Sequence, residues 1–300
     1  MPFHFAAKPT RFIPMLKLGP LALAAFLIAG PALAKPPVWI VRDADSELVI
    51  FGSVHVLPPG LDWRPPALDA ALAKADDLWF ELPMGPATEA EIAGLAASRG
   101  VLPPDKSLSG LLSPTGATAL AKASQKFGLT PGFLDRLEPW FAEVALAGAE
   151  FRAAGADTDS GVEKALAATA PASAQRRAFE TAAQQIALFD EAPVPAQVAS
   201  LEESLDQMDK DPDAYDRLVA AWMAADTAAL ERDALDPLRH ASPALYERLV
   251  SARNAAWTRV LDGRLKGHGR TVVVVGVGHL LTADGVPARL RALGYSVEGP

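Results

Sequence analysis

The chain has 300 residues, with 28 basic and 36 acidic side chains, and it contains no cysteine. This acidic balance disfavours nucleic-acid binding, because proteins of that class usually present a basic face. The lack of cysteine excludes a disulfide framework and a lipoprotein acylation site, so an exported domain would be held together by its core.

The first 34 residues have the pattern of a secretory signal peptide. Three basic residues and no acidic residue precede position 18, an apolar stretch covers 18–30, and Ala-Leu-Ala at 32–34 is a typical cleavage site. An uncleaved anchor is the alternative, but the apolar stretch is shorter than the roughly 20 residues that span a membrane. We therefore expect a periplasmic or secreted protein that begins at residue 35 and has no membrane span after cleavage.

The mature chain begins with the pattern of a β-hairpin. Two runs rich in β-branched and aromatic residues, 39–42 and 48–51, flank four turn-forming residues at 43–46. A helix is expected from the Pro-Pro pair at position 65 to about residue 75, because proline is favoured in the first helical turn. A short strand follows at 78–80.

From residue 87 to about 263 the pattern is helical. Prolines stand at the expected helix starts, which are Pro131, Pro139, Pro195, Pro212 and Pro243. The chain then returns to a strand at 272–275, a helix at 287–293 and a closing strand at 295–298. We predict a single α/β domain over 35–300, with a mixed central sheet formed by the two chain ends and a long helical middle section that covers the strand C-termini.

The unit Gly-x-x-His occurs twice, each time directly after an apolar run that reads as a strand. Its copies are Gly52-Ser53-Val54-His55 and Gly276-Val277-Gly278-His279. Neighbouring parallel strands would deliver both histidines to one crevice at the carboxyl edge of the sheet. Histidine is the commonest metal ligand, so we expect a shared site, although each histidine alone could be a hydrogen-bonded or surface residue.

A third candidate is Glu81, which directly follows the strand at 78–80. At the carboxyl end of this strand a carboxylate could ligate a metal, act as a general base on a bound water, or pair with a histidine. A solvated acid before a proline is the alternative.

Two helical segments carry further polar candidates. We expect Glu180 and Gln184 to lie together at i,i+4 on one helix, and Arg253 and Trp257 to lie one turn apart on another. Solvent-exposed faces are the usual explanation of such pairs. On the second helix the predicted buried residues are Leu245, Leu249, Ala252 and Ala256.

In order along the chain, these residues resemble the TraB/GumN family. The matching segments are Gly52-Ser53-Val54-His55-Val56-Leu57-Pro58-Pro59-Gly60, Trp63-Arg64, Ala75-Asp76-Asp77 before Phe80-Glu81-Leu82, Phe179-Glu180 with Gln184, Arg253-Asn254-x-x-Trp257, Val275-Gly276-Val277-Gly278-His279-Leu280, Gly285-Val286-Pro287 and Gly294-Tyr295-x-Val297. The family includes the Tiki proteins, described as metal-dependent proteases, and is related in fold to erythromycin esterase and ChaN-like haem-binding proteins.

The resemblance implies that His55, His279 and Glu81 are metal and catalytic residues. It also implies supporting roles for Arg253, Asn254, Glu180 and Gln184. Imidazole and carboxylate ligands suit zinc, iron, manganese or cobalt and do not choose among them. The expected function is metal-dependent hydrolysis of a peptide or another small substrate. The alternatives are a binding protein for haem, metal, peptide or a polysaccharide precursor, and a protein that sequesters a peptide signal; nothing in the sequence sets an oligomeric state.

Overall fold

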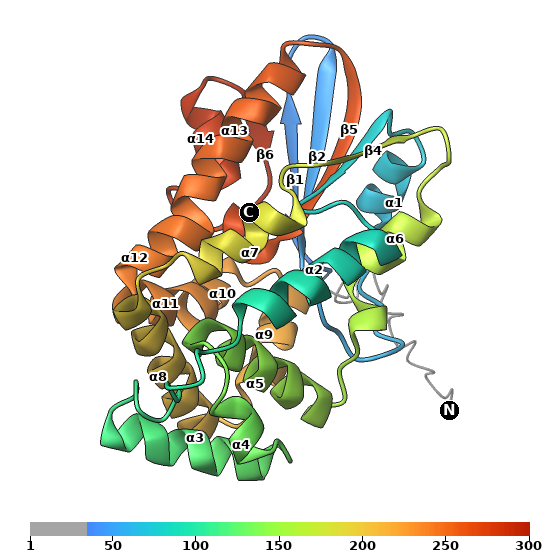
Figure 1. Cartoon of the computed structure of the whole chain (residues 1–300). Coiled ribbons are helices and arrows are strands. Elements are labelled where there is room, and N and C mark those ends of the chain that lie inside the picture. Colours follow the sequence, from blue (N-terminus) through green and yellow to red (C-terminus); the bar gives the residue numbers. More distant parts are fainter. Residues whose placement is uncertain (1–34) are drawn as a thin grey trace, which may run out of the picture. The chain divides into compact units, whose positions relative to one another are not determined.

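A six-stranded sheet with the order β4-β3-β5-β2-β1-β6 organises residues 35–300, which are the residues that the computed structural model describes (Figure 1). The predicted signal peptide lies outside these residues. The strands β4, β3, β5 and β2 are parallel, whereas β1 runs antiparallel to both β2 and β6. The bounds are β1 Val38–Arg42, β2 Ser46–Ser53, β3 Asp77–Phe80, β4 Gln175–Ala178, β5 Gly269–Gly276 and β6 Ser296–Glu298. The predicted mixed α/β sheet formed near both chain ends is confirmed.

The two central strands are those that precede the Gly-x-x-His units. β2 and β5 pair in parallel, with Ser53 opposite Gly276 at their carboxyl ends. Their apolar side chains are almost fully buried, as expected for strands covered on both faces by helices. This pairing places the two histidine-bearing turns at the same edge of the sheet.

Helices cover both faces of the sheet. In Figure 1, α1 (Pro66–Leu72) and α6 (Val162–Thr169) lie on one side of it, and α13 (Ala252–Leu265) and α14 (Val286–Ala292) lie on the other. All four contribute buried side chains to one core with the strands. After β2 the chain continues to α1 on one face of the sheet, and after the adjacent strand β5 it continues to α14 on the opposite face. In open α/β sheets such a switch point opens a crevice at the strand C-termini, where ligands bind.

The helical middle section is confirmed, with one strand inside it. Its remaining elements are α2 Pro86–Arg99, α3 Pro114–Lys126, α4 Pro131–Leu134, α5 Pro139–Ala153, the 3₁₀ turn η1 Thr158–Ser160, α7 Ala182–Asp190, α8 Val194–Lys210, α9 Ala214–Met223, α10 Thr227–Leu230, the π turn η2 Glu231–Leu235, α11 Asp236–Ala241, α12 Pro243–Tyr246 and the π turn η3 Glu247–Ser251. The strand β4 is absent from the prediction, because its sequence Gln-Arg-Arg-Ala has no β-branched or large apolar residue. It is an exposed edge strand, where charged side chains discourage further pairing.

Prolines begin helices largely where predicted. Pro131, Pro139 and Pro243 are the first residues of α4, α5 and α12, and Pro195 is the second residue of α8. Pro212 instead precedes α9, which begins at Ala214. In residues 35–300 no helix combines the length and the apolarity that crossing a membrane requires.

Of the predicted buried stripe near residue 250, Leu245 is buried, and Leu249 and Ala256 are partly buried against the core. The prediction is wrong for Ala252, which is exposed, and the more deeply buried residues of this segment include Val250, Asn254 and Trp257. The π turn η3 explains the difference, since its wider turn shifts the helix phase by about one residue. This shift turns Asn254 and Trp257 inward, toward the sheet.

We expect the Asp77→Ala variant to lose about 3 kcal/mol of unfolding free energy, as for a broken buried ion pair. Asp77 is 6% exposed, and its two carboxylate oxygens each accept a 2.8 Å hydrogen bond, from Arg177 and from Arg264. Arg177→Ala is the control, because its side chain is 46% exposed and should contribute less than about 1 kcal/mol. Urea denaturation measures both values; equal small losses would contradict the structural role.

Candidate functional site

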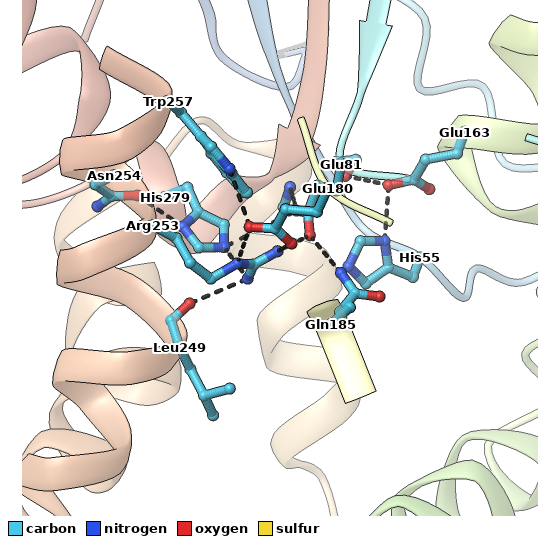
Figure 2. Close-up of polar contacts among 12 residues, drawn as sticks. His55, Glu81, Glu163, Glu180, Gln185, Leu249, Arg253, Asn254, Trp257 and His279 are labelled. Carbon is cyan, nitrogen blue, oxygen red and sulfur yellow. Dashed lines mark hydrogen bonds and ion pairs between the residues drawn. The ribbon is translucent and has the colours of Figure 1, made fainter. Parts of the chain in front are cut away.

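Three side chains from separate strand ends, His55, Glu81 and His279, belong to one group of polar residues (Figure 2). All three lie close to the backbone of Gly276. Glu81 directly follows β3, His55 lies two residues beyond β2, and His279 lies in the 3₁₀ turn η4 (Val277–Leu280) after β5. A Cβ atom on Gly276 would lie 3.3 Å from Glu81 Oε1, 3.6 Å from His55 Nε2 and 3.7 Å from His279 Cδ2. The glycine thus leaves a small space that all three side chains border.

His279 is buried and held at both ring nitrogens. Its Nδ1 lies 2.7 Å from Asn254 Oδ1, and its Nε2 lies 2.9 Å from Arg253 Nη1. Because arginine only donates, Nε2 accepts and Nδ1 carries the proton. Burial is the main cause that lowers the pKa of His279, to about 4, so the ring is neutral at physiological pH.

Arg253 connects most of the site. Its guanidinium donates to Glu81 Oε2 at 2.6 Å and to both oxygens of Glu180 at 2.8 and 2.9 Å. It also stacks on Trp257, with 4.5 Å from its Cζ to the ring centroid, and the indole N–H donates to Glu180 Oε1 at 3.0 Å. A planar guanidinium with two carboxylates forms a rigid, pre-oriented unit. The structure thus brings Arg253 and Glu180 together with the three residues around Gly276.

Glu81 is a buried carboxylate whose oxygens already have partners. Oε1 accepts from the backbone N–H of Gly276 at 2.7 Å, and Oε2 accepts from Arg253 and from Gln185 Nε2 at 3.3 Å. Burial alone would raise the pKa of Glu81, but Arg253, followed by the two histidines, outweighs it and lowers the pKa to about 2. Glu81 is therefore a fixed negative charge and a weak proton acceptor, which argues against the general-base role that its position left open.

His55 pairs with a carboxylate that sequence reasoning missed. Its Nδ1 lies 2.7 Å from Glu163 Oε1, and the Ser53 hydroxyl donates to the same oxygen. The Glu163 charge raises the pKa of His55 to about 9. Glu163 lies on α6, 108 residues from His55, and no local motif marks it.

A cavity of about 260 Å³ opens beside His55 and Glu81. Phe80, Leu82 and Met84 form an apolar part of its lining. The other lining residues besides His55 and Glu81 are Thr158, Gly161, Glu163, Lys164 and Gln185. The His55 side chain is 62% exposed, whereas that of His279 is 9% exposed. A small molecule or a chain segment in this cavity would meet His55 first.

The predicted placement of Glu180 and Gln184 on one helix is wrong. α7 begins at Ala182, so Glu180 precedes it, and Thr181 caps the helix in a reciprocal pair of hydrogen bonds with Gln184. This capping box occupies the Gln184 side chain. The next residue, Gln185, reaches Glu81 instead.

Within residues 35–300 no group of three His, Cys, Asp or Glu side chains is arranged to hold a metal ion. His279 Nε2 and Glu81 Oε1 are 3.9 Å apart, and Arg253 bonds to both residues. The side chains that the sequence predicts as ligands thus lie close together, and the Arg253 guanidinium bonds to two of them, His279 and Glu81.

The model of the TraB/PrgY/gumN family matches residues 37–299. The chain belongs to the TraB/PrgY/gumN family. No curated protein and no solved structure matches it. In this TraB/PrgY/gumN domain the match covers every strand and both Gly-x-x-His units.

We expect the stabilising contribution of the His55–Glu163 pair to fall in alkaline solution. The pKa of His55 is raised to about 9 by Glu163 in the fold and returns to about 6.5 in the unfolded chain. The contribution is therefore complete below about pH 6.5 and is lost as the pH rises toward 9. The measurement is the difference in melting temperature between the metal-free wild type and Glu163→Gln; a difference that stays constant over this window would contradict the pairing.

Proposed function

We propose that this TraB/PrgY/gumN domain is a metal-dependent hydrolase of the periplasm or the cell exterior that cleaves peptide bonds. One observation carries the proposal: His55, Glu81 and His279 border a single space at the switch point of the sheet. The resemblance to the Tiki proteins supports the peptide substrate, and the signal-peptide pattern of residues 1–34 supports export.

The donor set fits a divalent ion in its chemistry and in its supporting contacts. Each histidine has its Nδ1 engaged by an oxygen, from Glu163 for His55 and from Asn254 for His279. Such outer partners fix the ring orientation and reserve Nε2 for a metal, as they do around metal-binding histidines generally. His55 Nε2 and Glu81 Oε1 both border the space at Gly276, and His279 would exchange its hydrogen bond with Arg253 for the ion.

A divalent ion bound there would act as a Lewis acid and lower the pKa of a coordinated water. The residues of the chain have separate tasks. Glu81 supplies a permanent negative charge, held by Arg253 and the Gly276 N–H. Arg253, whose donors are engaged by Glu81, Glu180, His279 and the Leu249 carbonyl, holds the two carboxylates in place. Glu163 orients His55, which borders the cavity and whose Nε2 would be left free to bind the ion.

A binding protein without chemistry is the second candidate, and one observation favours it. Both oxygens of Glu81 are engaged and its pKa is lowered to about 2, so the site lacks a strong general base at that position. Haem, a metal, a peptide or a polysaccharide precursor would then be held without being cleaved.

The test measures metal content and turnover of the mature chain. After treatment with a chelator, the protein is loaded with zinc, manganese, cobalt or iron in turn and incubated with a peptide library. We expect turnover with at least one ion, and loss of both metal and turnover in His55→Ala and His279→Ala. The His268→Ala control, an exposed histidine outside the site, should behave as wild type. Metal uptake without turnover under every condition would favour the binding protein.

A further inference from the structure

A second cavity, of about 300 Å³, lies within the helical middle section. Residues of α5, α8, α11, α12 and the π turns η2 and η3 line it, together with Phe189 near the end of α7. Most of its wall is apolar: Trp140, Val144, Ala147, Phe189, Ala234, Pro237, Leu238, Ala241, Leu245 and Leu249. The space is large enough for a small organic molecule.

One wall of this cavity is polar and acidic. Glu143 accepts hydrogen bonds from the hydroxyls of Ser200, at 2.9 Å, and Ser204, at 2.7 Å. Glu203 lines the same wall, and no lysine, arginine or histidine lines the cavity. No ion pair found within residues 35–300 involves Glu143 or Glu203, so this wall carries two carboxyl groups and no basic side chain of the protein.

The sequence of α8 builds this wall. Leu201, Leu205 and Met208 pack into a core with α3, α4 and α5 on one side of the helix. Ser200 and Ser204, one helical turn apart, face the cavity and carry side chains too small to fill it. A larger apolar residue at either position would close the space.

Two further features of the cavity suit a cation. Trp140 and Phe189 stack with ring centroids 6.0 Å apart, and aromatic rings attract cations through their negative faces. Burial raises the pKa of the Glu143 carboxyl, and the two serine hydroxyls only partly oppose this. A positive charge beside Glu143 would favour its ionised form.

We propose that this cavity is a binding site for an organic cation, a small molecule with an apolar part and a protonated amine. The amine lies against Glu143, and the apolar part lies against the aromatic and aliphatic wall. The site is separate from the space at Gly276, but it reaches Leu249, whose carbonyl accepts from Arg253 at 3.0 Å. The inference does not depend on hydrolysis or on a metal.

The test is calorimetric titration of the metal-free mature chain with three probes of one size: hexylammonium, hexanol and hexanoate. We expect hexylammonium to bind at least tenfold more tightly than hexanol, a ratio that corresponds to about 1.4 kcal/mol, and hexanoate to bind weakest. Glu143→Gln keeps the shape and removes the charge, and it should reduce the preference for the ammonium to about threefold or less.

Two further variants locate the binding. Ala147→Leu fills the cavity from α5 and should abolish binding of hexylammonium and hexanol alike. His55→Ala changes the other site and should leave both affinities unchanged. Equal affinity for the three probes, an unaltered preference in Glu143→Gln, or no binding of the ammonium would each overturn the proposal. None of these outcomes bears on the proposed hydrolysis of a substrate at the site around Gly276, which is measured separately.

Discussion

Gly276→Ala is expected to lower turnover, or metal affinity, by about 10²-fold or more while the protein stays folded. The added methyl group would stand in the space that Glu81, His55 and His279 border, 3.3 to 3.7 Å from atoms of each. The methyl group would occupy the space proposed for the ion, and a misplacement of about 1 Å in a reaction centre is enough for a loss of this size. The backbone of Gly276, with φ −49° and ψ 134°, is open to any residue, so no strain is expected.

The matched control is Gly263→Ala, in α13, where an added Cβ has no atom within 4 Å. This change should raise the unfolding free energy by about 0.5–1 kcal/mol and leave turnover unchanged. Urea denaturation and peptide turnover are measured for both variants. A Gly276→Ala protein with wild-type turnover would show that the space at Gly276 is not the reaction centre.

The sequence predicts the position of this centre because strand ends are marked locally. An apolar run, a glycine and a histidine three residues later recur at β2 and β5, and parallel pairing brings the ends of both strands to one edge. The difference between the histidines is not encoded in the motif. Ser53 lies opposite Gly276, so the two units are offset by one residue. After β5 the turn η4 packs His279 against Trp257, with ring centroids 4.4 Å apart, whereas His55 stays exposed.

Residues that depend on helix phase could not be predicted from spacing. Glu163 faces His55 because α6 packs beside β2, which is a tertiary contact without a local signal. Gln185 rather than Gln184 reaches Glu81, because a cap at Thr181 starts the helix one turn later than the apolar pattern indicates. A π turn likewise moves Asn254 inward. Single-residue shifts of this kind decide which side chains belong to a site.

Glu81→Gln is expected to lower turnover by about 10²–10³-fold, the size of a lost electrostatic contribution, and to preserve the fold. The amide keeps the size of the carboxylate and an oxygen that can accept from Gly276 N–H, but it removes the charge that faces Arg253 and both histidines. Since Glu180 also pairs with Arg253, the guanidinium keeps one carboxylate partner. Glu191→Gln, at a surface carboxylate 64% exposed, is the control and should keep full turnover.

Metal content separates the two roles that remain for this carboxylate. If Glu81 is a ligand, Glu81→Gln loses metal affinity and turnover together, and excess metal restores part of the turnover. If Glu81 acts through its charge alone, metal content stays at the wild-type level and excess metal restores nothing. Unchanged turnover in Glu81→Gln would exclude both roles. It would leave the two histidines, His55 and His279, as the residues on which turnover depends.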